Sequence, residues 1–360
     1  MKNSDAVSEN QLFYLVTIEL FCLISLFLPG FLSGGLKQDS IIGLIVGFGF
    51  ACIFAWMLSL FCARYRNVFL KADKKSGVIM DIFRFILFIQ TILITVFVLN
   101  ITWEIVQMFL LPDVNKTVIL VSFYMVCIFA SLKDISVRAR AAEFCGRFFA
   151  LLLVILLILS LRKIDLNQYE MLLLQPVGKI INGGYEVFLL FESIVFSLFA
   201  AGSLNKKSYT KAVKKSLYFS IIFGIIMLTV LMGTFGVDYI AVMDFPAIRL
   251  LRNLTQNGGF LSRMDVLMTG IWLFSLFFFA SGGIQYSRLL LKSVMEESVS
   301  ESLNIILIVV IFVVTIIFGN MQNSYYIYRS YMYYIGTPAI VLTLIILLIK
   351  KDRGQKIEKK

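Results

Sequence analysis

Ten apolar runs, separated by short charged or glycine-containing stretches, are the feature that most restricts the fold of this chain. A helix that spans a bilayer needs about 20 apolar residues. Hydrophobic residues make up 59% of the 360 residues and charged residues 15%, whereas about a quarter of a soluble chain is charged. The connecting stretches are too short for a soluble domain of about 50 residues, so we predict an all-α integral membrane protein with a single membrane domain over 1–360. The ten predicted spans lie at 12–34, 40–62, 79–110, 117–132, 144–161, 185–204, 216–237, 264–290, 303–319 and 331–349.

The distribution of Lys and Arg predicts the orientation of these spans. With the N-terminus in the cytoplasm, the inner segments hold 22 of the 33 Lys and Arg residues, the outer segments hold nine, and two lie within spans. Cytoplasmic loops carry such an excess. We therefore predict that both termini are cytoplasmic, that 350–360 is a basic cytoplasmic tail near lipid headgroups, and that Arg138 lies in an inner loop. Because the basic residues set orientation, we expect no nucleic-acid partner.

Composition excludes several function classes. The chain has no His, and its five Cys are scattered without a CxxC pair. This argues against Ser-His-Asp and Cys-His catalysis and against His- or Cys-ligated metal sites. No glycine-rich phosphate-binding motif is present. We therefore expect no enzyme activity, no cofactor and no metal.

Ten spans divide into two sets of five, 1–161 and 185–349. Because five is odd, the second set would enter the membrane in the opposite sense to the first. This is the arrangement of inverted-repeat, LeuT-like transporters, whose solute binds near mid-membrane between broken helices.

A break is predicted in the first span at Leu28-Pro29-Gly30. Proline removes a backbone donor and glycine tolerates non-helical angles, and freed backbone groups in a membrane must face protein or a wet cavity. Pro29, Gly30 and the preceding Ser25 are therefore candidate substrate-binding residues. A simple proline kink is the alternative.

Intramembrane carboxylates give further candidates, because an ionised side chain at mid-bilayer is costly unless it is paired or hydrated. Each has a structural alternative: a buried hydrogen bond, or for Glu19 a position near the inner headgroups. The candidates, with the polar residues near them, are Glu192, Ser193, Ser197, Glu104, Asn100 and Glu19.

The outer part of the second half carries several weaker signals. Arg263 and Asp265 open the eighth span and could gate the path or cap the helix. Residues 244–252 read as an amphipathic helix on the outer interface. The tyrosines between 325 and 334 are typical of an interfacial aromatic belt, and Gly282-Gly283 is typical of close helix packing.

Several segments together resemble one known family. The segment 244–252, with an aromatic-Pro-Ala sequence, continues through 259–265 to Trp272 in the eighth span. Shorter matches are Leu28-Pro29, Trp103-Glu104-Ile105-Val106, Gly146-Arg147-Phe148 and Glu192. These features resemble the B subunits of spore germinant receptors, the GerAB-like endospore germination permeases of the amino acid–polyamine–organocation superfamily.

The resemblance implies a ten-helix transporter fold that recognises amino acids or similar nutrients beside the first helix. It also implies partner A and C subunits in the spore inner membrane, and a structural or gating role for Trp272. The stretch 22–27 lacks the glycines that family members often carry, and the sixth span offers only Gly202 as a breaker. A more apolar nutrient, or a subunit without a ligand, therefore stays open.

The leading hypothesis is a permease-like germinant-receptor subunit that binds a small nutrient at mid-membrane and signals germination. Two alternatives remain. One is a stand-alone proton-coupled amino-acid permease in the plasma membrane, and the other is a non-binding membrane scaffold of the receptor.

Overall fold

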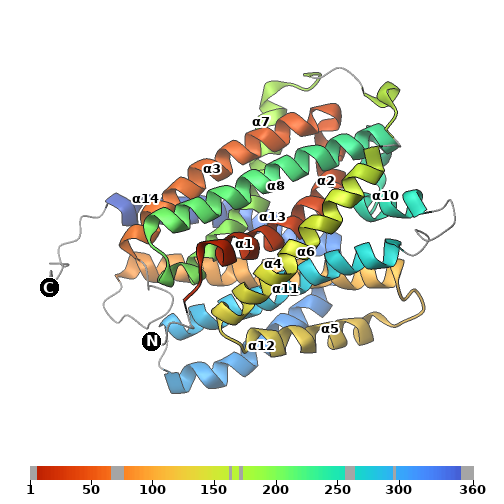
Figure 1. Cartoon of the computed structure of the whole chain (residues 1–360). Helices are drawn as coiled ribbons and strands as arrows, with labels where there is room; N and C mark the ends of the chain where they lie inside the picture. Colours follow the sequence, from red (N-terminus) through yellow and green to blue (C-terminus); the bar gives the residue numbers. More distant parts are fainter. Residues whose placement is uncertain are drawn as a thin grey trace.

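The computed structural model describes residues 6–65, 77–161, 164–169, 173–255, 264–294 and 297–349, and these form helices joined by short turns, with no strand among them. The first half contains α1 (Glu9–Cys22), α2 (Leu28–Leu36), α3 (Ser40–Arg64), α4 (Val78–Phe109), α5 (Lys116–Ser131) and α6 (Ile135–Leu161). The second half contains α7 (Val177–Phe191), α8 (Lys206–Phe235), α9 (Val237–Val242), α10 (Pro246–Thr255), α11 (Met264–Val294), α12 (Glu297–Phe318), α13 (Met321–Tyr331) and α14 (Thr337–Ile349). Figure 1 shows most of the long helices packed in one bundle with their axes roughly aligned.

The first span is irregular beside the predicted break. Between α1 and α2 the chain forms a π-helical turn, η2 (Leu23–Phe27), in which the Leu28 amide donates to the Leu23 carbonyl. Pro29 lies in the first turn of α2, where its ring would clash with the carbonyl of Ser25 in a regular α-helix. A π turn widens the ladder and removes that clash. The helix is therefore bulged before Pro29 rather than fully broken at 28–30.

Two further spans contain irregular helical segments, and neither segment includes a proline. After α7 the chain tightens into a 3-10 helix, η5 (Glu192–Ser203), and between α13 and α14 it widens into a second π turn, η7 (Met332–Gly336). A 3-10 run of this length is uncommon. The change begins at Glu192, ten residues before Gly202, the only breaker that the sequence offers.

The start of α1 and the end of α14 lie at the same end of the bundle (Figure 1). Lys211 Nζ, near the start of α8, lies 2.8 Å from Glu9 Oε1 at the start of α1. Arg64, at the end of α3, donates to the Leu348 carbonyl near the end of α14. We name this the terminal end and the opposite one the pocket end.

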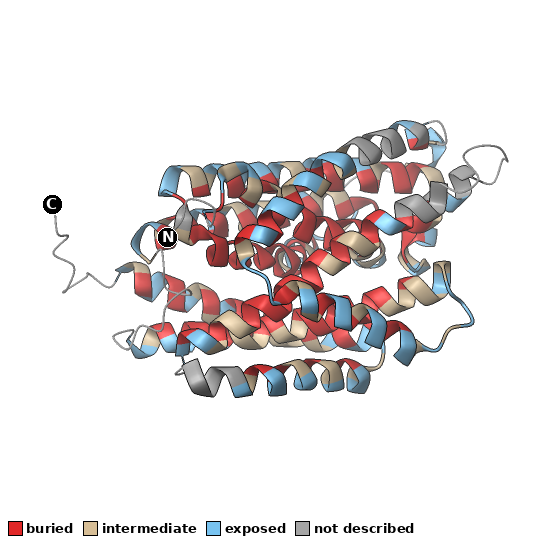
Figure 2. Cartoon of the chain, turned by 60° about the horizontal axis from the view of Figure 1, so that its bottom comes forward, coloured by how far each residue is buried: buried red, intermediate tan, exposed pale blue. Residues whose placement is uncertain are grey.

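The surface of the bundle is apolar enough for a membrane. Five helical runs among the described residues are long and apolar enough to cross one, or six if α5 and α6, which bend by 115°, count as a single broken span. One of these runs, Glu9–Arg64, has 56 residues, or about 84 Å of helix at 1.5 Å per residue, and it turns back between α2 and α3 (Figure 1). Buried residues fill the centre and exposed ones lie outside (Figure 2). The chain is thus a multi-pass membrane protein, while the count of ten spans stays a prediction.

Some element boundaries differ from the predicted spans because the helices continue past the apolar runs. α8 begins at Lys206, where the Asn205 side chain caps it by accepting from the Ser208 amide. The last span begins with α13 at Met321, capped by the Asn320 side chain. Polar first turns of this kind are satisfied by their caps, so hydropathy alone misses them.

The amphipathic helix predicted within 244–252 is present as α10, but its apolar face lies against the protein and not against lipid. In α10 and the residue before it, the apolar side chains of Phe245, Ala247, Ile248 and Leu250 are buried. The helix packs on η2, α6, α8 and α11. Its apolar face therefore covers the protein, and α10 closes part of the pocket end over the irregular turn of the first span.

Candidate functional site

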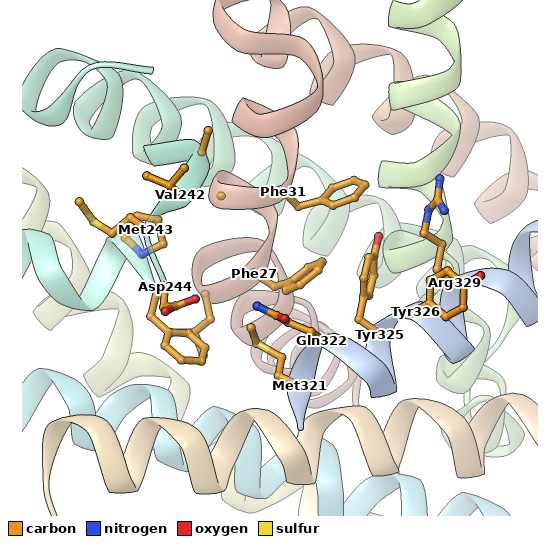
Figure 3. Close-up of a pocket in the computed structure, with 15 residues that line it drawn as sticks. Phe27, Phe31, Val242, Met243, Asp244, Met321, Gln322, Tyr325, Tyr326 and Arg329 are labelled. Carbon is orange, nitrogen blue, oxygen red and sulfur yellow. The ribbon is translucent and has the colours of Figure 1, made fainter. Parts of the chain in front are cut away.

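A cavity of about 510 Å³ opens at the pocket end between the first span, the turn joining α9 to α10, and α13. Its walls include Leu26, Phe27, Gly30 and Phe31 from η2 and α2, Ala241 to Pro246, and Met321, Gln322, Tyr325, Tyr326 and Arg329 from α13. Figure 3 shows Phe27 and Tyr325 between Asp244 on one side and Arg329 on the other. Small-molecule sites have this volume and this mixture of apolar walls with few polar groups.

The charged groups at the cavity have different surroundings. Asp244 is exposed. Arg329 forms an ion pair with Glu186 of α7 and lies 5.7 Å from the centroid of the Tyr333 ring. The cavity therefore has the carboxylate of Asp244 on one side of an aromatic wall and, on the other, a guanidinium already paired with Glu186.

Aromatic rings separate the cavity from the centre of the bundle. The ring centroids of Phe27 and Tyr325 lie 4.2 Å apart, and Phe97 of α4 contacts both at 5.2 and 5.4 Å. Phe97 also stacks on Tyr328, whose hydroxyl donates to the Leu189 carbonyl over 2.9 Å. We name Phe27, Phe97, Tyr325 and Tyr328 the aromatic barrier. It joins the cavity wall to α7 one turn before Glu192.

Two predicted site residues, Asn100 and Glu104 of α4, position α13 without lining the cavity. Asn100 Nδ2 lies 2.8 Å from Ser324 Oγ and 3.3 Å from the Thr315 carbonyl. Glu104 Oε1 accepts from the Met321 amide over 2.7 Å at the start of α13, where a helix leaves amide donors unpaired and favours negative charge. These contacts fix the helix that supplies five of the cavity residues.

Glu192 lies at the junction of α7 and η5 and is 0% exposed. The Thr337 hydroxyl donates to its Oε2, and among the described residues no group hydrogen-bonds to its Oε1. Burying an ionised carboxylate without an opposite charge costs several kcal/mol. Glu192 is therefore suited to holding a proton, a cation or the ammonium group of a solute.

The remaining predicted residues are placed as follows. Ser25 is buried in η2 and accepts a 2.9 Å hydrogen bond from Trp272 Nε1 of α11. Pro29 is buried, and Gly30 lines the cavity. Ser193 donates to the Leu190 carbonyl and Ser197 pairs with the Tyr209 hydroxyl, so their hydroxyl groups are used within the fold. Arg263 lies outside the described residues, as does the side chain of Asp265.

Sequence reasoning missed three groups of residues. The prediction for 244–252 does not include a cavity, yet Asp244, Phe245 and Pro246 line one together with Ala241, Val242 and Met243. The prediction of an interfacial tyrosine belt is wrong for Tyr325 and Tyr328, because both side chains are buried among other rings. Arg138 is buried against Glu19 rather than exposed in a loop. Gly282 indicates a close contact at this point of α11. A Cβ there would overlap the Arg138 guanidinium.

Replacing Glu104 by alanine should weaken the start of α13. Loss of a helix-capping group costs about 1 kcal/mol, so the thermal unfolding temperature of the purified protein should fall by about 1–2 °C. The matched control is Glu143→Ala in α6, because Glu143 pairs with Arg147 at the surface and surface pairs contribute little. Equal shifts for the two variants would remove the positioning role of Glu104.

Two solved structures share the fold of this chain. Its fold is shared with a Na⁺-coupled sialic acid symporter in a substrate-bound, outward-open state, at a TM-score of 0.62 and 11% identity over 96% of this chain and 79% of the symporter. It is also shared with Mhp1, a nucleobase-cation-symport-1 family transporter in a closed conformation with bromovinylhydantoin bound, at a TM-score of 0.60 and 13% identity over 94% and 80% of the two chains. The predicted LeuT-like transporter fold is confirmed.

The chain belongs to the Spore_permease family, described as "Spore germination protein", whose model matches residues 6–327. It is 24% identical over 254 residues to spore germination protein A2 of Bacillus subtilis (strain 168), covering 68% of this chain and 67% of that relative. The predicted family is confirmed, and the family and its structural neighbours are permeases and transporters.

Proposed function

We propose that this chain is the permease-like subunit of a spore germinant receptor and that it binds a small nutrient in the cavity at the pocket end. The observation that carries the proposal is the cavity itself, in a member of a spore germination family with a transporter fold. Phe27, Phe31 and Tyr325 would hold an apolar body, while Asp244 and Arg329 would attract an amino and a carboxylate group. This favours an amino-acid-like nutrient with an apolar side chain.

In the proposed mechanism the nutrient shifts a conformational equilibrium that partner subunits detect. A ligand moves such an equilibrium only through different affinities for the two states. Contact with Phe27 and Tyr325 would part the aromatic barrier and open a path from the cavity towards the buried residues Ser25 and Glu192. Tyr328 connects the barrier to α7, so the same motion would reach the second irregular span.

The proposed setting follows from the family and from the charge distribution. The terminal end would face the cytoplasm, because the basic segments predicted to be inner lie at the ends of α3 and α8 that meet there. The pocket would then open to the other side of the spore inner membrane. A- and C-type receptor subunits would be the partners.

The proposal is tested by ligand-dependent stabilisation of the purified chain. A ligand that binds only the folded protein raises stability by about 2.7 kcal/mol at 100 times its Kd. We expect a panel of amino acids to raise the unfolding temperature, with Leu, Val and Phe exceeding Asn and Asp, and we expect Asp244→Asn and Arg329→Gln each to reduce the shift. No stabilisation by any nutrient would instead support the scaffold.

Glu192 favours a second candidate, a proton-coupled permease that acts alone. A buried carboxylate with one unpaired oxygen could carry the proton. Proteoliposomes containing only this chain would then accumulate the stabilising amino acid when an inward proton gradient is applied, and Glu192→Gln would abolish the dependence on the gradient. Absence of uptake, with binding intact, favours the receptor.

A further inference from the structure

A buried cluster of charged and polar side chains lies at the other end of the bundle from the cavity. Arg138 of α6 forms an ion pair with Glu19 of α1, and their side chains are only 5% and 6% exposed. Tyr286 of α11 donates to Glu19 Oε1 over 2.9 Å. Arg138 also donates to Gln285 Oε1 at 3.2 Å and to the Phe278 carbonyl at 2.8 Å. The cluster thus ties three helices together.

The position of the cluster is at the terminal end. Gln285 donates to the carbonyl of Lys133, which lies in the turn between α5 and α6. That turn is on the side where α1 begins, because α5 starts at the pocket end, where Lys116 donates to the Gly319 carbonyl just before α13. The cavity is therefore open at one end of the bundle while charged groups close the other.

The cluster is also connected to the irregular sixth span. The Tyr286 ring stacks on Phe196 and Phe199 of η5 at centroid distances of 5.4 and 4.7 Å. The Arg138 guanidinium lies 5.0 Å from the centre of the same ring. Movement of η5, which begins at Glu192, would thus displace Tyr286 from Glu19.

We propose that Glu19, Arg138, Gln285 and Tyr286 form a latch that holds the terminal end closed, and that the latch opens when the protein exposes its centre to that side. Separating a buried ion pair without hydrating it leaves an uncompensated charge. A partly opened latch is therefore unfavourable, and the cluster favours either a fully closed or a fully open arrangement. Because the first span carries Glu19 in α1 and the cavity-wall residues in η2 and α2, the latch is the means by which solute binding at the pocket end would be transmitted. This last step rests on the proposed function, whereas the latch itself does not.

The chain supplies a reporter for the latch. Cys22 is buried one turn after Glu19, and its thiol donates to the Glu19 carbonyl over 3.2 Å. With the other four cysteines replaced by alanine, its labelling by N-ethylmaleimide measures opening between α1, α6 and α11. No nutrient is needed, so failure of this test is separate from failure of the proposed function.

Gly282→Ala is the most selective variant, because its Cβ would overlap the Arg138 guanidinium and displace it without removing a charge. Gly270→Ala in the same helix is the matched control, since a Cβ there meets nothing within 4 Å. We expect Gly282→Ala and Glu19→Gln to raise the Cys22 labelling rate about tenfold, within the usual range of conformational couplings, and Gly270→Ala to leave it unchanged. Tyr286→Phe, which removes one hydrogen bond, should give a smaller increase.

A second reporter separates opening of the latch from general destabilisation. Cys62 of α3 is also buried, and α3 packs mainly on α7 and α8 rather than on the latch helices. In a background that retains only Cys62, the same variants should leave labelling unchanged. An equal rise at Cys22 and Cys62, or no rise at Cys22 in folded Gly282→Ala protein, would overturn the proposal.

Discussion

Replacing Gly30 by leucine is expected to abolish the nutrient response while the protein still accumulates in the membrane. Gly30 lines the cavity, and a Cβ there would lie 3.4 Å from the Met243 carbonyl and 3.6 Å from the Ile240 carbonyl, which are ordinary contact distances. Alanine therefore fits, but the longer leucine side chain would extend among the residues of 241–246 and fill the space. We expect the half-maximal nutrient concentration to rise at least about 100-fold, equivalent to about 2.7 kcal/mol.

The measurement is a germination dose–response curve for spores in which the variant replaces the wild-type chain. Gly35→Leu is the control, because Gly35 is exposed in the same helix and a Cβ there meets nothing within 4 Å. Immunoblots of spore membranes establish that both variants accumulate. A normal curve for Gly30→Leu would exclude the cavity as the binding site.

Replacing Trp272 by alanine is expected to give the largest loss of stability. The Trp272 side chain is fully buried, stacks on Phe21 at 6.5 Å and donates to Ser25 Oγ in the π turn. Removing a buried tryptophan costs about 3–5 kcal/mol through the cavity that remains. The apparent unfolding temperature of the purified protein should fall accordingly.

Two matched variants separate packing from hydrogen bonding at this site. Trp272→Phe keeps most of the packing but loses the bond to Ser25, which is worth about 1 kcal/mol. Trp56→Ala removes a tryptophan that is 58% exposed on α3 and should cost less than about 1 kcal/mol, since surface changes are usually small. Similar effects for Trp56→Ala and Trp272→Ala would contradict a structural role of Trp272 at the π turn.

Much of the fold could be predicted because lipid imposes simple rules on sequence. Backbone groups in a bilayer must be paired within helices, so each apolar run has a helix in the structure. Pro29 located the irregular part of the first span to within a few residues, because a ring without an amide proton disturbs the preceding turn. The start of η5 at Glu192 has no such local signal in the sequence, because no proline or glycine lies at that point.

The cavity was harder to predict because it depends on contacts between segments far apart in the sequence. Gly30 was identified from its own chemistry. Tyr325 and Met243 are ordinary apolar or aromatic residues near a membrane surface, and only α13 and α10 folding over the first span bring them together. Arg138 looked like a loop charge because its partner, Glu19, lies in another helix.

The proposed site for a small solute lies beside the π turn at the pocket end. A cryo-electron microscopy structure of the protein saturated with the amino acid that stabilises it most tests this directly. We expect solute density enclosed by Phe27, Gly30 and Tyr325. Solute density elsewhere, or an empty cavity under conditions in which the amino acid stabilises the protein, would contradict it.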